Sequence, residues 1–588
     1  MSTPTPLSLV HEGWNHMRLQ RPLAAWASWQ RALRIDPDDL PARQALAVLE
    51  STAELPVAAR SVYRFRTPAD EARRRRWDVR LRGRQQGLDD LDDAAEAFAA
   101  LADDDPADEA AWYNTGLCLA WLGRNAEAIA ALDRATTLLA PADHERAAAA
   151  WTLAEVLRLG AGAEAQADDL RYVWIVEQTD ADAPLHGLLA RWPSLRPVAL
   201  PTDPLTGGKA IDDAQVFEWL DHPISTPAQA TGPPRPEEVA RVLATVIATP
   251  GEVRLSTPDP AGLDALSDPP LAEVARALRA ARKEAIPLPL AWADAALGTF
   301  RFPPGLNEAA LGVLTRGIVE RYFETLWIHR PRHGLGDRTP LEASRAAAAG
   351  DAVLGAKLEG VVRFREQLGT RSTHALLYQG YPFDRLRRRL GLINPESTGA
   401  VDAADLTCQS EAELDALDVA QLDGERLADA FTAAFSFGDD ARTARFAAEL
   451  ARREPPSLAR LDLEAVVAPL VRAALQDGDP ERALERLARA TELARGDGQR
   501  RTFTTWSAEV LARSGRPGAA LEAYRLIVAS ADAGTAAAAA LDGAETLLDC
   551  GDPATAATLL DEARSLARAA GDRAIESRAD ALLRTLEC

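Results

Sequence analysis

Residues 112–141 read WYNTGLCLAWLGRNAEAIAALDRATTLLAP. Apolar residues recur in it three and four positions apart on both sides of Gly123, which is the pattern of amphipathic helices. A glycine between two such segments supplies the positive φ that a tight inter-helix turn favours. The stretch therefore predicts a helix-turn-helix unit.

Several residues of this stretch stand at the positions that define a tetratricopeptide repeat (TPR), a unit of about 34 residues. They are Trp112, Gly116, Gly123, Ala128, Leu132 and Ala135. A shift by one repeat towards the N-terminus brings to equivalent positions Leu81, Ala94, Phe98 and Pro106. A further copy near the start matches at Gly13, Ala25, Trp29, Ala32 and Pro37. The first part of the chain thus resembles the TPR family.

Three segments near the C-terminus repeat in a similar way and align at Gly478, Gly515 and Gly551. In each, a proline two positions after the glycine is suited to start the next helix. The spacings between the glycines are 37 and 36 residues, slightly longer than in the family, and a more degenerate copy begins at Phe437. These segments resemble tetratricopeptide repeats less closely than the N-terminal copies, so we describe them as TPR-like.

The predicted fold is all-α, with two TPR-like helical-repeat arrays (α-solenoids) on either side of a mostly helical middle domain. Residues 1–190 are expected to form the N-terminal TPR array and residues 401–588 the C-terminal TPR-like array. The middle domain, residues 191–400, starts with a loop-rich part in which proline and glycine are frequent.

The expected secondary structure around and within the middle domain is almost entirely helical. The helical pattern continues from Trp151 to Trp174, and it returns in PEEVARVLATVIA, residues 236–248, and in several later segments. The best strand signal is short: EVRLST, Glu252–Thr257.

Composition excludes several classes of function. A net charge of -22 opposes binding to phosphate backbones, so a nucleic-acid partner is disfavoured. The four cysteines form no C-x-x-C pair, and no run of eighteen apolar residues occurs. We therefore expect a cytoplasmic protein with no membrane partner.

The candidate chemical sites are weak. LTGGKA, residues 205–210, lacks the first glycine and the final hydroxyl of a phosphate-binding loop. His329 and His333 are four residues apart, but Pro331 between them breaks the helical spacing that a metal pair would use. Without a catalytic motif, we predict no enzyme activity, no catalytic residues, no cofactor and no bound metal.

A basic, aromatic region lies between Thr315 and Leu390, where fourteen Lys and Arg stand against eight Asp and Glu. Arginine and aromatic side chains are enriched at interfaces. The region therefore offers candidate partner-binding residues: Trp327, Arg330, Arg338, Arg385 and Arg388. Three explanations remain open: the region binds an acidic protein, it binds nucleic acid, or its aromatics are simply the domain core. Thr339, Pro340 and Glu342 fit a helix N-cap with a capping box.

The TPR resemblance implies a non-catalytic scaffold that binds a peptide or protein partner, of unknown identity, in its grooves. Asn114 matches a position that often contacts the ligand backbone in this family. One alternative is a regulatory module whose middle domain recognises an acidic protein or nucleic acid; Gly334–Ala343 resembles a short signature of toxin-binding domains of bacterial antitoxins. A further alternative is an enzyme with an unrecognised helical active site. The oligomeric state stays undetermined.

Overall fold

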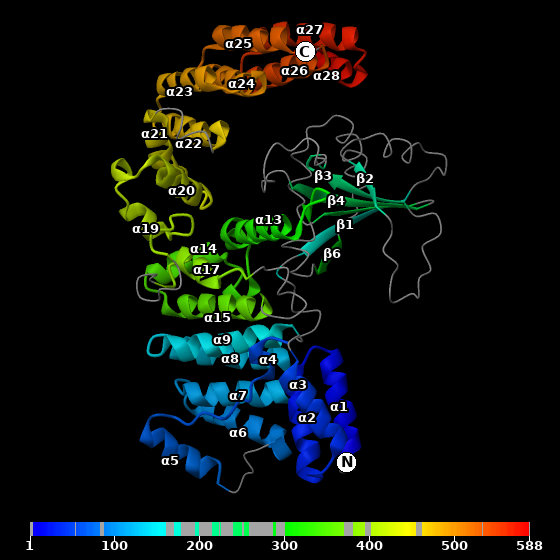
Figure 1. Ribbon diagram of the computed structural model, residues 1–588, viewed down its shortest axis with the longest axis vertical. Coiled ribbons are helices and arrows are strands. Elements are labelled where there is room, and N and C mark those ends of the chain that lie inside the picture. Colours follow the sequence, from blue (N-terminus) through cyan, green and yellow to red (C-terminus); the bar gives the residue numbers. More distant parts are fainter. Residues whose placement is uncertain are drawn as a thin grey trace. The chain divides into compact units, whose positions relative to one another are not determined.

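Two compact units, residues 1–400 and residues 401–588, make up the chain in this computed structural model (Figure 1). The structure describes residues 4–52, 55–82, 88–159, 168, 170–177, 195–198, 215–222, 224, 239–249, 252–257, 286–289, 300–369, 380–393, 402–453, 461–531 and 533–586. None of the described helices combines the length and the hydropathy that a membrane span requires.

The first unit begins with helical hairpins. Their helices are α1 (Pro6–Arg18), α2 (Pro22–Ile35), α3 (Leu40–Ser51), α4 (Val57–Arg60), α5 (Glu71–Arg80), α6 (Leu91–Asp104), α7 (Glu109–Trp121), α8 (Asn125–Leu139) and α9 (His144–Arg158). In the first hairpin, Trp29 fills the seam between α1 and α2 and is 1% exposed. A Cβ atom at Gly13 would lie 2.2 Å from its Nε1, so the close approach of the two helices requires glycine.

The stretch at residues 112–141 forms the predicted hairpin of α7 and α8. Gly123 has a φ of 75° in the turn between them. A Cβ atom at Gly116 would lie 2.9 Å from Cγ of Leu132, which shows how closely the helices pack. The helix-turn-helix prediction for this stretch is confirmed.

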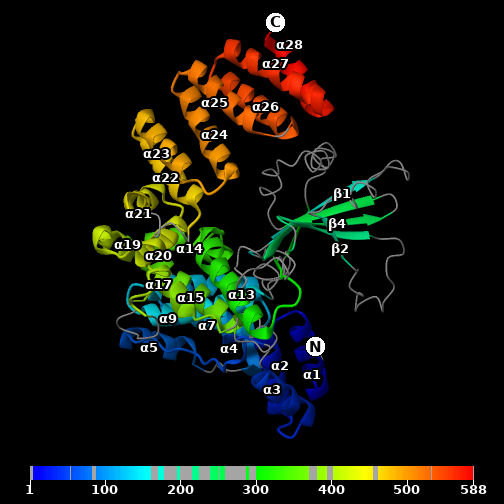
Figure 2. The same cartoon turned by 45° about the horizontal axis from the view of Figure 1, so that its top comes forward.

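The next hairpin is split in the sequence. α9 packs against α8 on one side and against α15 (Ala352–Gly369) on the other (Figure 2). α9 and α15 therefore form one pair although residues 159–351 separate them in the sequence. A Cβ atom at Gly360 would lie 2.8 Å from Cβ of Trp151 and 2.9 Å from the carbonyl oxygen of Ala148. The hydroxyl of Thr152 donates to the carbonyl of Gly360 at 3.3 Å. α15 therefore takes the place of the second helix of this hairpin.

An antiparallel sheet occupies part of the intervening chain. Its strands are β1 (Leu170–Glu177), β2 (Leu195–Val198), β3 (Gln215–Leu220), β4 (Ala240–Thr249), β5 (Glu252–Thr257), β6 (Ile286–Pro289) and β7 (Phe300–Arg301). Six of them follow the order β2-β3-β4-β5-β1-β6, and β7 pairs with β4. In register, Trp219 lies opposite Leu195 and Ala244, and Leu255 lies opposite Trp174 and Val246.

The sheet corrects two sequence predictions while leaving the chain mainly helical. The helix expected to continue to Trp174 ends with α9, and β1 runs through that residue. The segment at residues 236–248 is mostly strand β4 rather than helix. Val242, Ala244 and Val246 are buried at alternate positions, and the neighbouring apolar residues Leu243 and Ile247 hide this period of two from a search for helical periodicity. The strand expected at EVRLST is confirmed as β5.

Helices return after the sheet. They are α13 (Glu308–Arg321), α14 (Pro340–Ala348), α15 and α17 (Phe383–Arg389), with a π-helical turn at Tyr322–Leu326 and 3-10 turns at Trp327–His329 and His333–Leu335. α13 packs on the sheet side through Leu314 and Ile318, which cluster with Val239 and Phe300. The sheet and the following helices therefore share a small core.

Thr339 caps α14 as the sequence predicts. Its hydroxyl accepts from the backbone N–H of Glu342 at 3.1 Å, and the Glu342 carboxylate accepts from the backbone N–H of Thr339 at 2.8 Å. Pro340 stands in the first turn, where its missing N–H costs nothing.

Removal of this cap gives a stability prediction. Thr339→Ala should lower the free energy of unfolding by about 0.5–2 kcal/mol, because an N-terminal N–H loses its partner. Chemical denaturation of the full chain measures this. Thr137→Ala, at an exposed position in α8, is the control and should change stability by about 0.5 kcal/mol or less. Equal effects of the two substitutions would contradict the role of the cap.

The second unit is a series of helical hairpins. Its helices are α19 (Glu411–Ala416), α20 (Gly424–Phe435), α21 (Asp440–Arg452), α22 (Leu463–Gln476), α23 (Pro480–Leu493), α24 (Asp497–Arg513), α25 (Pro517–Ser530), α26 (Ala533–Asp549), α27 (Pro553–Ala570) and α28 (Arg573–Leu586). Gly478, Gly515 and Gly551 stand in the predicted turns with φ of 74°, 75° and 79°. Each is followed two residues later by the proline that starts the next helix.

Candidate partner-binding sites

Asn114 does not face an empty groove. Its side chain is fully buried, and its Oδ1 accepts from the backbone N–H of Arg66 at 2.8 Å. Its Nδ2 donates to the carbonyl of the same residue at 2.8 Å. Arg66 belongs to an extended segment, Ser61–Pro68, that we call the strap. The position predicted to hold a ligand backbone therefore holds the chain's own backbone.

Two side chains of the strap pack on the same repeats. The guanidinium carbon of Arg66 lies 3.6 Å from the ring centroid of Tyr113, a cation–π contact. The ring of Phe65 lies 5.0 Å from that of Phe98 and 5.4 Å from that of Trp121. Two further hydrogen bonds hold the strap: the Tyr63 hydroxyl donates to the carbonyl of Ala58 at 2.8 Å, and Arg74 donates to the carbonyl of Pro68 at 2.8 Å.

The aromatic residues of the basic, aromatic region form a core. Trp327 is completely buried. The ring of Phe323 lies 6.1 Å from that of Trp327, 5.2 Å from that of Tyr381 and 5.1 Å from that of Phe383. Of the three explanations that the sequence leaves open, the core explanation describes these side chains.

The arginines of this region are also largely internal. Arg388 is 1% exposed. Arg385 pairs with the buried Glu324 at 2.8 Å. Arg330 is partly exposed, with its guanidinium 6.0 Å from the ring of Tyr322, whereas Arg338 is exposed. The structure therefore does not bring the predicted residues together on one surface.

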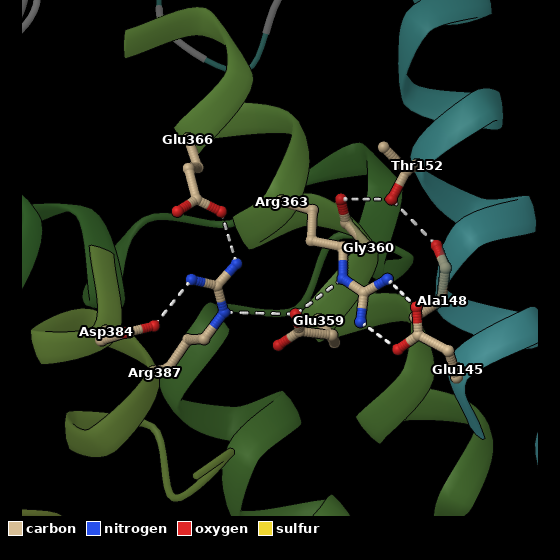
Figure 3. A network of polar contacts seen from close by, with 9 residues as sticks. All are labelled: Glu145, Ala148, Thr152, Glu359, Gly360, Arg363, Glu366, Asp384 and Arg387. Carbon is tan, nitrogen blue, oxygen red and sulfur yellow. Dashed lines mark hydrogen bonds and ion pairs between the residues drawn. The ribbon is translucent and has the colours of Figure 1, made fainter. Parts of the chain in front are cut away.

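Two arginines link α9, α15 and α17 (Figure 3). Arg363 bridges the carboxylate of Glu145 on α9, at 2.5 and 2.6 Å, to Glu359 on its own helix at 2.8 Å. The hydrogen bonds from Arg363 lower the pKa of Glu145. The network joins the two halves of the split hairpin through charge-assisted hydrogen bonds.

The second arginine of this network is Arg387 on α17. It contacts Glu359 at 3.2 Å, Glu366 at 2.6 Å and Asp384 at 3.1 Å (Figure 3). Burial opposes its charge, but the contacts with Glu366 and Glu359 outweigh burial and raise its pKa. The arginine-rich helix α17 is therefore attached to α15 through Arg387, which was not among the candidate partner-binding residues.

Helix α5 carries four consecutive arginines, Arg73–Arg76, and two of them form ion pairs within the chain. Arg73 and Arg76 contact Asp105 at 2.9 and 2.6 Å, and the indole N–H of Trp77 donates to Asp108 at 2.8 Å. These contacts neutralise part of the run. They also hold α5, which follows the strap, to the loop before α7.

A pocket of about 280 Å³ lies between α22 and α24 in the second unit. Its lining is Ala468, Val471, Arg472, Leu475, Trp506, Glu509, Val510 and Arg513. α22, α24 and α26 are the first helices of successive hairpins, and we call the side they share the first-helix face. Trp506 is partly exposed on it, with its ring 5.6 Å from that of Phe503. One signal in the sequence points to this site: position 506 is a tryptophan, whereas the equivalent position one repeat later is Asp542.

Two carboxylates on the first-helix face carry unusual pKa values. Burial raises the pKa of Glu509, and burial together with the charge of Glu545 raises the pKa of Asp542. Both charges act on Tyr524, whose pKa is raised mainly by its own burial. In the described part of the chain, neither carboxylate has a hydrogen bond or ion pair from a side chain. The charge of Arg513 lowers the pKa of Glu509 and partly opposes the effect of burial, whereas the charge that acts on Asp542 is the negative one of Glu545.

The two histidine candidates lie in the 3-10 turns that precede α14. Nδ1 of His333 lies 2.6 Å from Asp337, while His329 is exposed in its 3-10 turn. Within the described residues, no group of three or more His, Cys, Asp and Glu could hold a metal ion. LTGGKA lies outside the described residues.

Comparisons with known proteins identify the repeats. The tetratricopeptide repeat family matches residues 85–144 and residues 469–538, one segment in each block of hairpins. A comparison with curated proteins finds no match. A solved structure described as a "Circular tandem repeat protein with novel repeat topology and enhanced subunit contact surfaces" is 15% identical, with 98% of this chain and 96% of that chain covered. Its TM-score of 0.11 is too low to support any argument.

Proposed function

Because the chain carries tetratricopeptide repeats in two separate blocks, we propose that it is a non-catalytic scaffold that binds a protein or peptide partner on the first-helix face of its C-terminal repeats. The observation that carries this proposal is the pocket between α22 and α24 with the partly exposed Trp506. Helical-repeat proteins commonly use such extended faces to hold partners. The N-terminal site at Asn114, in contrast, is already filled by the strap.

The chemistry of the face indicates the partner. Ala468, Val471 and Leu475 offer apolar surface opposite Trp506, and tryptophan is among the side chains that contribute most to binding. Glu509 and Asp542 add negative charge to this face, although the charge of Arg513 partly offsets the effect of burial on the pKa of Glu509. The partner segment is therefore one with an apolar anchor next to a lysine or arginine.

Selection of a displayed random peptide library against the immobilised full chain tests this proposal. Enriched peptides should combine an apolar residue with a basic one, and Trp506→Ala should weaken their binding by about tenfold or more, as loss of an interface hot spot does. Leu526→Ala is the control, because Leu526 is 67% exposed on α25 of the same repeats and outside the pocket. Peptides that bind both variants equally well, or no enrichment at all, would refute the proposed face.

The raised pKa values add a pH prediction. A basic peptide binds the charged carboxylates, so its affinity should fall as the pH drops through the raised pKa values of Glu509 and Asp542. Glu509→Gln should weaken binding at neutral pH and flatten this dependence. Calorimetric titration between acidic and neutral pH measures both effects. An affinity that rises on acidification would contradict the assigned role of the carboxylates.

A further inference from the structure

We infer that the site around Asn114 is a second binding site, for an extended peptide in which an aromatic residue precedes an arginine, and that the strap occupies it as an intramolecular competitor. The observation is the seated strap itself, whose contacts define what the site accepts. This inference is independent of the proposed C-terminal face, because it concerns residues of the first unit alone.

The clamp at Asn114 recognises backbone. The Asn114 amide accepts from the N–H and donates to the C=O of one residue, at 2.8 Å each, so it recognises extended backbone and not a particular side chain. Because Asn114 is fully buried beneath the strap, its amide would lose both partners if the strap left without a replacement. A second peptide of similar backbone geometry would restore both hydrogen bonds.

Two neighbouring contacts give the site its preference. Phe65 of the strap meets Phe98 and Trp121, a surface that suits another aromatic ring. The guanidinium of Arg66 lies over Tyr113, a geometry that arginine fits better than lysine does. A partner therefore needs an aromatic residue directly followed by arginine.

Of the remaining strap residues, Tyr63 is partly buried and Pro68 is buried. Ser61, Val62, Arg64 and Thr67 are exposed. The strap is tethered at both ends: the backbone N–H of Ala58 donates to Gln367 on α15, and Asp70 caps α5. Such tethering gives an intramolecular ligand a high effective concentration even when its own contacts are few. The apparent affinity of an outside peptide is then its intrinsic affinity multiplied by the fraction of time that the strap is away from the site.

A peptide of the strap sequence, SVYRFRTPAD, carrying a fluorophore tests the inference by anisotropy on the full chain. A chain with Phe65→Ala and Arg66→Ala has a weakened strap and an intact site, and should bind this peptide about tenfold or more tightly than the unchanged chain does. Addition of Asn114→Ala should abolish that gain. A peptide in which the phenylalanine and arginine are both alanine should not bind.

The outcome that overturns the inference is a double variant that keeps its native circular dichroism and melting transition yet binds the peptide no better than the unchanged chain. If the variant does not fold, amide hydrogen exchange on the unchanged chain decides. The Arg66 amide should exchange through a local opening, faster than the α7 amides, whereas equal protection would make the strap a fixed part of the fold. Trp506→Ala should leave binding of the strap peptide unchanged, which separates this site from the C-terminal face.

Discussion

Trp327→Ala is expected to lower the free energy of unfolding by about 3–5 kcal/mol, the usual cost of emptying a buried tryptophan site. Trp327 is completely buried, and its ring lies close to Phe323, with the guanidinium carbon of Arg332 5.1 Å from its centroid. The loss combines removal of the ring from the core with an unfilled cavity. Urea denaturation of the full chain, followed by circular dichroism, measures it.

The matched control comes from the same segment. Arg338 is exposed on the surface, and Arg338→Ala should change stability by about 0.5 kcal/mol or less. The pair of substitutions separates the two roles that the basic, aromatic region could have. A tryptophan of an interaction surface would lose partner binding while the protein kept its stability, so a stable Trp327→Ala protein would contradict the core assignment.

Arg387→Ala is the second substitution with a large expected effect. Its guanidinium contacts three carboxylates, of Glu359, Glu366 and Asp384, and its side chain is only 10% exposed. Removal of one partner of a buried charge network costs about 3–5 kcal/mol, because the opposite charge stays buried without compensation. We expect a loss in the lower part of this range, since Glu359 keeps Arg363.

Arg316→Ala is the control for charge removal. Arg316 pairs with Glu320 at 3.0 Å on the surface of α13, where such pairs contribute about 0–1 kcal/mol. Thermal melting of both variants at low and high salt adds a second readout, because salt screens the exposed pair more than the buried network. Similar melting temperatures for the two variants would show that the network is not needed to hold α17.

The sequence predicted those parts of the fold whose signal is local. Gly123, Gly478 and Gly515 mark turns because glycine accepts positive φ, and the helices beside them follow from periodicity within a few turns. The sheet was missed because β4 is apolar at most positions, so that its alternation does not show. The pairing of α9 with α15 was missed because it depends on residues far apart in the sequence.

The candidate sites show the same limit. Asn114 was identified as a backbone-binding position, but the sequence could not say that Arg66 provides the backbone. Arg385 and Arg388 were assigned to a surface because composition records charge and not burial. The acidic partner of Arg385, Glu324, lies on another element, and Arg388 is buried. Trp506 was overlooked since a single tryptophan in a helix is more often core than surface.

The split hairpin has a consequence for the order in which the protein is made. α9 leaves the ribosome long before α15, so its packing surface, including Trp151, stays uncovered while residues 159–351 are synthesised. Contact between α9 and α15 requires closure of a large loop, and the entropic cost of loop closure slows the formation of this contact. The sheet strands emerge during that interval and can pair before the hairpin closes. The N-terminal repeats can therefore be completed only after the ribosome has translated the segment that is inserted between α9 and α15.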